Sequence, residues 1–184
     1  RCFAFRFLSY FMKLPSSRDL ELMTKRTLLI VDDEPSARSG LQKLLSQDGY
    51  EVVVAENGAK ALTIFDERPI DGVITDMKMP EMGGLELVEA LRNRGAQLPI
   101  LVVTAFGEIG SAVNAMRRGA DDFLTKPIDL DVLLLSLNRA FERRDLVLEA
   151  EHLRTQLRTH LEEGLQGLVG SSPAMQDVYR LARQ

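Results

Sequence analysis

The sequence predicts an α/β fold in which a five-stranded, doubly wound parallel sheet is followed by an extended C-terminal helix. Strand-like and helix-like patterns alternate five times within about 115 residues, and such βα repeats favour parallel strands with right-handed crossovers. The strand candidates are almost continuously apolar, which is typical of a sheet covered by helices on both faces. They span residues 27–31, 51–54, 71–75, 99–103 and 121–125.

The helix candidates fill the intervals between these strands. Residues 35–47 come first, with an apolar face formed by Ala37, Leu41, Leu44 and Leu45. Spacings of three and four residues are those of an amphipathic helix. The next three candidates span residues 58–67, 84–93 and 108–118. Glycine or proline marks the joints between elements, at Gly49, Pro69, Gly95 and Gly119.

The last helix candidate, residues 129–162, contains no glycine or proline and begins at Asp129, a suitable N-cap. At about 1.5 Å per residue it would extend about 50 Å, further than the sheet requires. A 4-3-4 spacing of apolar residues among charged ones predicts a short coiled-coil seam. An amphipathic helix packed on its own domain is the alternative, and we favour a dimerising linker. The seam consists of Leu146, Ala150, Leu153 and Leu157.

The two ends of the chain differ from this pattern. Residues 1–22 are rich in aromatic residues interrupted by basic ones, which suits either a membrane-surface or signal-like segment or a non-native, disordered extension. We favour the extension, because Met23 lies just before the first strand and suits a natural start. After Gly164, the segment GLVGSSPAMQDVYRLARQ predicts a new helix from about Ala174.

Composition removes several classes of site. The single cysteine, Cys2, excludes an internal disulfide and a cysteine metal cluster. Both histidines, His152 and His160, come late in the chain, so we expect no histidine-based triad in the main domain. A net charge of -4 argues against a nucleic-acid-binding surface. Apolar runs are too short to span a bilayer.

Polar residues directly follow four of the apolar runs. They are Asp32 and Asp33 after LLIV, Asp76 after GVIT, Thr104 after ILVV, and Lys126 after FLT. The carboxyl ends of parallel strands meet at one edge, where open α/β sheets bind ligands. Each residue alone could be a turn, a helix cap or a backbone hydrogen-bonding group. Together, in this order, they favour one functional pocket.

The chemistry of this pocket follows from its charges. Two carboxylates 4 Å apart repel by about 4 kcal/mol at an effective dielectric of 20, and Lys126 alone does not balance three of them. Either their pKa values rise or a divalent cation binds, and an oxygen site with few protein ligands suits Mg²⁺. Asp76, the isolated carboxylate, is the candidate nucleophile for phosphoryl transfer. Lys126 and Thr104 would then hold phosphoryl oxygens.

Residues 26 to about 145 resemble the receiver domain of two-component response regulators. The resemblance rests on VDDEPSAR (31–38), TDMKMPEMGG (75–84), VVTAFG (102–107) and GADDFLTKP (119–127). It implies a flavodoxin-like receiver with strand order 2-1-3-4-5.

The resemblance also implies a role for each site residue. Asp76 is the phosphoacceptor, and Asp33, Asp76 and the Lys78 backbone carbonyl bind Mg²⁺ directly. Asp32 contributes through water, and Lys126 binds the phosphoryl group.

Two further features follow from the same resemblance. Thr104 and Phe123 are the switch residues, and Phe123 lacks the hydroxyl of the tyrosine found in many family members. The Lys126–Pro127 peptide bond is cis, which a proline makes accessible.

The C-terminal segment resembles the start of the ATPase domain of sigma-54-dependent transcription activators of the nitrogen-regulator type. Residues 164–184 would then be the truncated start of an AAA+ domain. With the features above, we expect an N-terminal extension at 1–22, a receiver at 23–145 and a linker or coiled-coil helix at 146–163. The full-length protein would contact DNA and sigma-54 RNA polymerase, whereas this piece would bind neither nucleic acid nor membrane.

We therefore predict a cytoplasmic receiver that accepts a phosphoryl group from a sensor histidine kinase on Asp76. It would dimerise through the helix at 108–118, the strand at 121–125 and the long helix. Beyond slow self-phosphorylation and dephosphorylation, we expect no enzymatic activity. The alternatives are an Mg²⁺-dependent aspartyl-phosphate phosphohydrolase, which commonly has its nucleophile after the first strand, and a non-phosphorylated dimerisation module.

Overall fold

The computed structural model describes residues 25–104, 109–162, 172–175 and 177. The chain divides into two compact units, Arg1–Leu130 and Asp131–Gln184, and each is described by itself. The predicted extension at 1–22 lies outside the described residues, as does most of the predicted segment at 164–184. The domain boundary expected at residue 145 stays a prediction.

The first unit contains a five-stranded sheet in the order β2-β1-β3-β4-β5, in which all neighbouring strands are parallel. This confirms the predicted fold class and strand order. The strands are β1 (Thr27–Val31), β2 (Glu51–Ala55), β3 (Gly72–Asp76), β4 (Ile100–Thr104) and β5 (Asp122–Thr125). The chain adds β2 on one side of β1 and then β3, β4 and β5 on the other, so β1 and β3 are neighbours within the sheet.

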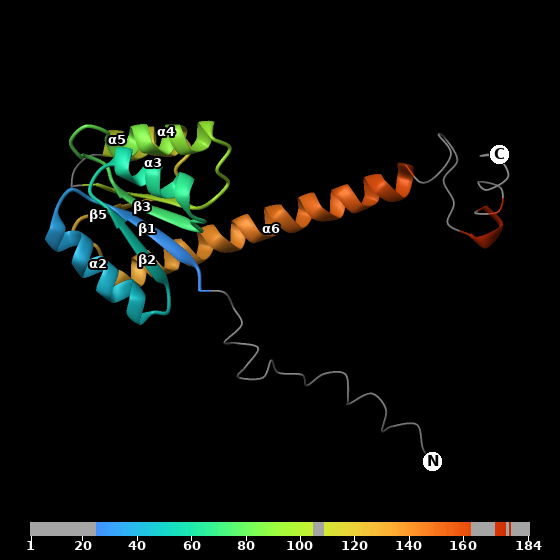
Figure 1. Ribbon diagram of the computed structural model, residues 1–184, viewed down its shortest axis with the longest axis horizontal. Coiled ribbons are helices and arrows are strands. Elements are labelled where there is room, and N and C mark those ends of the chain that lie inside the picture. Colours follow the sequence, from blue (N-terminus) through green and yellow to red (C-terminus); the bar gives the residue numbers. More distant parts are fainter. Residues whose placement is uncertain (1–24, 105–108, 163–171, 176, 178–184) are drawn as a thin grey trace, which may run out of the picture. The chain divides into compact units, whose positions relative to one another are not determined.

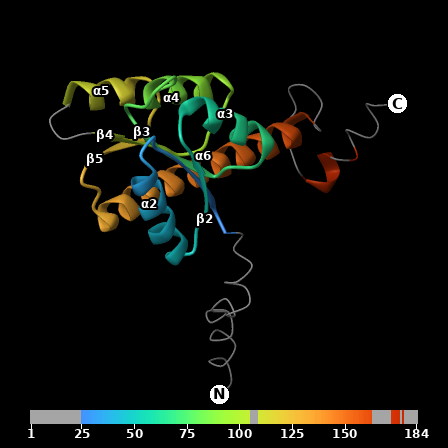
Figure 2. The ribbon, with the colours of Figure 1, turned by 60° about the vertical axis from the view of Figure 1, so that its left-hand side comes forward.

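Helices cover both faces of the sheet, as the apolar strands predict. Helix α2 lies on one side, and α3, α4 and α5 lie on the other (Figures 1 and 2). Every residue of β1, β3 and β4 is buried. The bounds of these helices are α2 (Pro35–Gln47), α3 (Gly58–Glu67), α4 (Gly84–Asn93) and α5 (Ile109–Arg117).

The core beneath α3, α4 and α5 is built from aliphatic side chains. Val31, Val73 and Val102 from three strands pack in one cluster with Leu87 and Leu91 of α4. Full burial of such a side chain contributes about 1.5–3 kcal/mol, so this layer fixes the strands firmly in register. The polar ends of the strands are thereby held at fixed positions.

Two strands end one residue later than the apolar runs predict. Asp76 pairs with Val103, and Thr104 pairs with Thr125, so both polar residues belong to the parallel ladder. The hydrophobic pattern stops before them, but the backbone pairing does not. Asp76 and Thr104 are therefore placed by the sheet itself.

The second unit begins within α6 (Leu130–Glu162), which confirms the extended C-terminal helix. Buried side chains occupy its first part, at Leu133, Leu137 and Phe141. Its later part carries exposed apolar side chains, including Leu146 (67% exposed) and Leu153 (51%). The side chain of Leu157, the last predicted seam residue, lies outside the described ones. No helix among the described residues is long and apolar enough to cross a membrane.

Candidate functional site

The carboxyl edge of the sheet brings together residues that are far apart in the sequence. Asp32 directly follows β1, Asp76 and Thr104 end β3 and β4, and Lys126 directly follows β5. The Lys126 backbone N–H donates to the Thr104 carbonyl at 2.8 Å, which continues the ladder past β5. The Lys126–Pro127 peptide bond is cis. One edge therefore holds four of the predicted site residues.

Lys126 contacts two carboxylates at once. Its Nζ lies 2.6 Å from Asp76 Oδ1 and 2.9 Å from Asp32 Oδ2. Both aspartates are buried, at 8% and 3% exposed. Because one ammonium serves two buried carboxylates, this cluster retains a net negative charge.

Backbone amides fix the other carboxylate oxygens. The Lys78 N–H donates to Asp76 Oδ2 at 2.8 Å, and the Glu34 N–H donates to Asp32 Oδ1 at 2.8 Å. Both bonds span two residues, so each aspartate is oriented by the loop that follows it. The Asp32 side chain thus shapes the turn before α2, whose N-cap is Glu34. The second carboxylate oxygen of Asp32, Oδ2, contacts Lys126.

The pKa of Lys126 is raised above its ordinary value of 10.5. Partial burial lowers this pKa, but hydrogen bonds and charges from Asp76 and Asp32 outweigh that effect. The stability from these contacts is therefore fully present below pH 10.5 and is lost as the pH rises through the folded-state pKa. The lysine is a cation throughout the neutral range.

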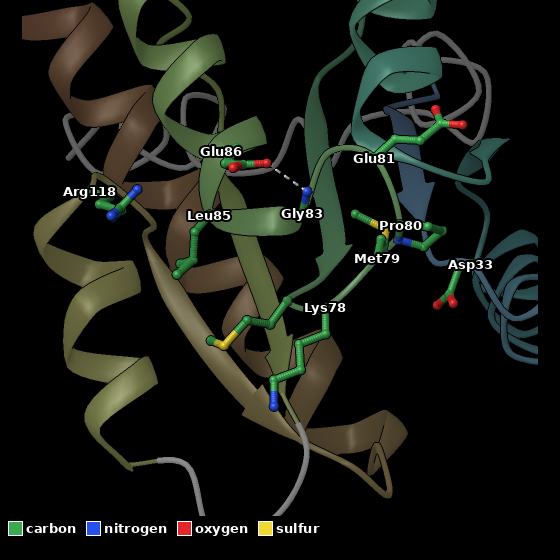
Figure 3. A pocket seen from close by; sticks show the side chains of 10 residues that line it. Asp33, Lys78, Met79, Pro80, Glu81, Gly83, Leu85, Glu86 and Arg118 are labelled. Carbon is green, nitrogen blue, oxygen red and sulfur yellow. Dashed lines mark hydrogen bonds between the residues drawn. The ribbon is translucent and has the colours of Figure 1, made fainter.

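Asp33 lies differently from its neighbour. Its side chain is exposed and lines an open hollow of about 740 Å³ beside the loop that connects β3 and α4. Lys78, Met79 and Pro80 of this loop line the same hollow (Figure 3). Among the described residues, no three acidic, histidine or cysteine side chains form a ready metal cluster. A cation here would have to draw on few side chains, backbone oxygen and water.

The two predicted switch residues differ in exposure. Thr104 is 2% exposed, whereas Phe123 is 40% exposed. Phe123 pairs with Val102, two residues before Thr104, so the register puts the two side chains on the same face of the sheet. The structure thus shows a buried hydroxyl and an outlying aromatic ring on neighbouring strands.

The contacts that shape the loop after Asp76 are not evident from the sequence. Glu81 has a φ of 66°, unusual for a residue other than glycine, and its Oε2 accepts a hydrogen bond from Asn57 Nδ2 at 2.8 Å. An Asn-Gly pair at 57–58 and a Gly-Gly pair at 83–84 mark both sides of this contact in the sequence. Such pairs predict turns in the backbone, but they do not show that Asn57 contacts Glu81.

Comparison with known proteins decides the family. The model of the response regulator receiver domain matches residues 28–138. This chain belongs to the response regulator receiver family. The match covers β1 from its second residue, the other four strands, the helices between them and every predicted site residue.

Relatives of this receiver include longer regulatory proteins. The regulatory protein AtoC of Escherichia coli K12 is 37% identical over 151 residues, which is 82% of this chain and 32% of AtoC. The DNA-binding transcriptional regulator NtrC of the same organism is 32% identical over 159 residues, covering 86% of this chain and 33% of NtrC. The chain thus spans about one third of the length of these relatives.

Solved structures agree with this assignment. A receiver domain protein from Clostridium thermocellum has a TM-score of 0.63 and 33% identity, over 66% of this chain and 98% of that one. NtrX from Brucella abortus, in complex with ADP, has a TM-score of 0.68 and 31% identity, over 85% of this chain and 33% of NtrX. The first likeness is to a receiver alone, and the second is to a longer chain.

Proposed function

We propose that this receiver accepts a phosphoryl group on Asp76 from a sensor histidine kinase and uses it to control the output of a transcription activator. The observation that carries the proposal is the shared contact of Lys126 with Asp76 and Asp32 at the carboxyl edge of the sheet. An ammonium held against a carboxylate nucleophile is placed to pair with the oxygens of an incoming phosphoryl group.

The residues present fit a divalent cation. Asp32 and Asp76 share one ammonium, the exposed Asp33 carboxylate directly follows Asp32 in the chain, and carboxylate oxygen is the donor that Mg²⁺ prefers. Asp33, Asp76 and the Lys78 carbonyl would hold Mg²⁺ directly, and Asp32 would hold it through water. A site with few protein ligands suits Mg²⁺, which keeps several waters. When bound, the cation neutralises charge on the phosphoryl oxygens.

The transfer itself needs little from the protein beyond positioning. An Asp76 carboxylate oxygen forms a bond to phosphorus while the bond from phosphorus to the kinase histidine nitrogen breaks, and the electron pair stays on that nitrogen. Lys126 pairs with one phosphoryl oxygen as it releases Asp76 Oδ1. With no histidine at this edge, we expect only slow self-phosphorylation and dephosphorylation.

Thr104 and Phe123 would convert this event into a change of shape. The Thr104 hydroxyl donates to a phosphoryl oxygen and moves toward Asp76, which frees space on its own face of the sheet. The exposed Phe123 ring then turns inward, driven by burial alone because it has no hydroxyl. The exposure of Phe123 supports this proposal, because the ring has apolar surface left to bury.

The output would be dimerisation. In the first unit, α5 and β5 expose Val113 (51%), Met116 (42%) and Phe123 (40%), and in the second unit α6 exposes Leu146 and Leu153. We propose that α5, β5 and α6, including the apolar seam of α6, form the interface of a homodimer. The whole cytoplasmic protein would continue into an AAA+ domain that works with sigma-54 RNA polymerase on DNA, and this piece would bind no nucleic acid.

A single experiment tests the proposal. The chain is incubated with Mg²⁺ and acetyl phosphate, or with beryllofluoride as a stable mimic of an aspartyl phosphate. Intact mass reports phosphorylation, and light scattering after size exclusion reports oligomeric state. We expect a response in the parent chain and in the exposed control Asp48→Asn, and none in Asp76→Asn. Identical behaviour of all three proteins would overturn the proposal.

A further inference from the structure

The loop that follows Asp76 is closed at its base. The Gly84 N–H donates to the Met77 carbonyl at 3.0 Å, so the two ends of the loop meet. A Cβ at Gly84 would come within 2.2 Å of the Asp76 carbonyl oxygen, which leaves no room for any side chain. The backbone between these points, which includes Lys78, has its base fixed by this contact.

The tip of the same loop is tied to the start of α3. Asn57 Nδ2 donates to Glu81 Oε2 at 2.8 Å, and the Gly58 N–H donates to the Met82 carbonyl at 3.1 Å. A Cβ at Gly58 would lie 2.6 Å from Met82 Cγ, so the two segments touch closely. The loop is therefore held at its base and at its tip, with Lys78 between them.

Asn57 is a rigid anchor for this contact. It is 6% exposed, and its Oδ1 accepts the Lys60 N–H at 2.8 Å as the N-cap of α3. Both ends of its amide are thus occupied, and it has no freedom to follow a moving loop. Glu81, by contrast, adopts a left-handed backbone conformation that a residue with a side chain rarely takes. Such a conformation persists where its surroundings hold it.

The Asn57 contact also directs the charge of Glu81. Figure 3 shows its carboxylate pointing away from Asp33, although Glu81 lines the same hollow. Glu81 is therefore not arranged as a ligand of a cation bound between Asp33 and Asp76. Its carboxylate serves as the acceptor that fastens the loop to α3.

We propose that Asn57 and Glu81 are positioning residues, which hold the β3–α4 loop so that the Lys78 carbonyl is already placed for the divalent cation. This inference rests on the proposed function. A loop that is ordered before binding loses less entropy when the cation arrives, so the clamp raises the affinity. Neither residue would be a ligand of the cation.

The test separates the hydrogen bond from the charge at Glu81. Glu81→Gln removes the charge but keeps an oxygen that accepts from Asn57, whereas Glu81→Ala removes both. Asn57→Ser keeps a hydroxyl that caps α3 but is too short to reach Glu81. Mg²⁺ affinity is measured by calorimetry, and amide hydrogen exchange of Met79–Met82 is measured in the metal-free proteins.

We expect Glu81→Ala and Asn57→Ser each to weaken Mg²⁺ binding about 3- to 10-fold, the range for the net contribution of one ordinary hydrogen bond. Their double variant should be no weaker than either, because both remove the same contact. Glu81→Gln should stay within about twofold of the parent and keep its slow loop exchange. Loop exchange should become faster in the two clamp-breaking variants.

The failures of the two proposals are distinguishable. Equal weakening by Glu81→Gln and Glu81→Ala would show that charge alone matters and would overturn the clamp. Unchanged affinity in Glu81→Ala and Asn57→Ser would also overturn it. A parent chain that binds no Mg²⁺ would overturn the proposed function instead, and hydrogen exchange in the metal-free proteins would still report whether the contact holds the loop.

Discussion

The two edges of the sheet differ in how many carboxylates share one basic side chain. At the amino edge Arg92 pairs with one carboxylate, that of Asp121, and the distance from Nη2 to Oδ2 is 2.8 Å. Its other donors are taken up by backbone carbonyls, and Asp121 also accepts the Ile100 N–H at 2.9 Å. At the carboxyl edge, Lys126 is shared between Asp32 and Asp76. The carbonyls bound by Arg92 are those of Gly119, Ala96 and Leu98.

This difference separates structure from function within one sheet. At the amino edge, Arg92 pairs one-to-one with Asp121 and joins the α4–β4 and α5–β5 loops through backbone carbonyls. The carboxyl edge keeps carboxylates in excess, at a cost in repulsion that a ligand of positive charge would relieve. An imbalance maintained by a rigid backbone is a more informative sign of a binding site than the presence of charged residues.

The largest expected effect tests whether the carboxyl edge is rigid. Gly84→Ala should lower the free energy of unfolding by about 3 kcal/mol or more, because its Cβ would press on the Asp76 carbonyl. Urea unfolding followed by circular dichroism measures the change. Gly40→Ala is the control, since its Cβ meets nothing within 4 Å and α2 should gain stability. If Gly84→Ala lowered the free energy of unfolding no more than an ordinary surface substitution does, the backbone at this edge would be able to adjust and would not be rigid.

The second effect tests whether the amino edge is purely structural. Arg92→Met should cost about 2 kcal/mol of unfolding free energy, because partly buried carbonyls lose their donor and Asp121 loses its ion pair with Arg92. The same urea experiment measures this loss. Mg²⁺ affinity should stay at the parent value, and a large loss of affinity would break the separation of the two edges.

The third effect tests the excess of negative charge. Without divalent cations, Asp76→Asn should raise the free energy of unfolding by about 1 kcal/mol, because a buried carboxylate is removed while Asp32 still pairs with Lys126. Adding Mg²⁺ should then stabilise the parent more than the variant. A variant less stable than the parent in metal-free urea titrations would show that the ion pair outweighs the repulsion.

The smallest effect is a matched control for Arg92. Arg94 lies two residues later, and its exposed side chain is 3.6 Å from Asp66. Arg94→Gln should change the free energy of unfolding by less than about 0.5 kcal/mol, as expected for a surface pair. Thermal unfolding of both arginine variants side by side checks this contrast. If the two variants lost similar amounts of unfolding free energy, the hydrogen bonds of Arg92 would contribute no more to stability than a surface ion pair does.

Much of this architecture could be predicted from the sequence. Apolar runs locate all five strands, and the polar residues that follow them locate the edge where Asp32, Asp76 and Lys126 meet. These predictions work because strand burial and parallel topology leave few alternatives. The direct contact of Asp32 with Lys126 was not predicted. Roles in metal binding and phosphorylation stay predictions.

The contacts that depend on exact loop geometry could not be predicted. Arg92 and Arg94 look alike in LRNRG, yet one closes the amino edge and the other lies on the surface. Asn57 and Glu81 are 24 residues apart, and no periodicity links them. Such pairings arise from the three-dimensional path of loops, which a one-dimensional pattern of polarity does not contain.

Under the proposed function, the sharing of Lys126 between two carboxylates would let the resting site discriminate between ions by their charge. A tethered ammonium is present at high effective concentration, so an entering ion competes with it for the same oxygens. A monovalent ion would bring no more charge than the lysine, whereas a divalent ion would add charge where an excess of carboxylate remains. Discrimination between monovalent and divalent ions would then need no binding site of matched size. It would follow from the position of the Lys126 ammonium directly after β5.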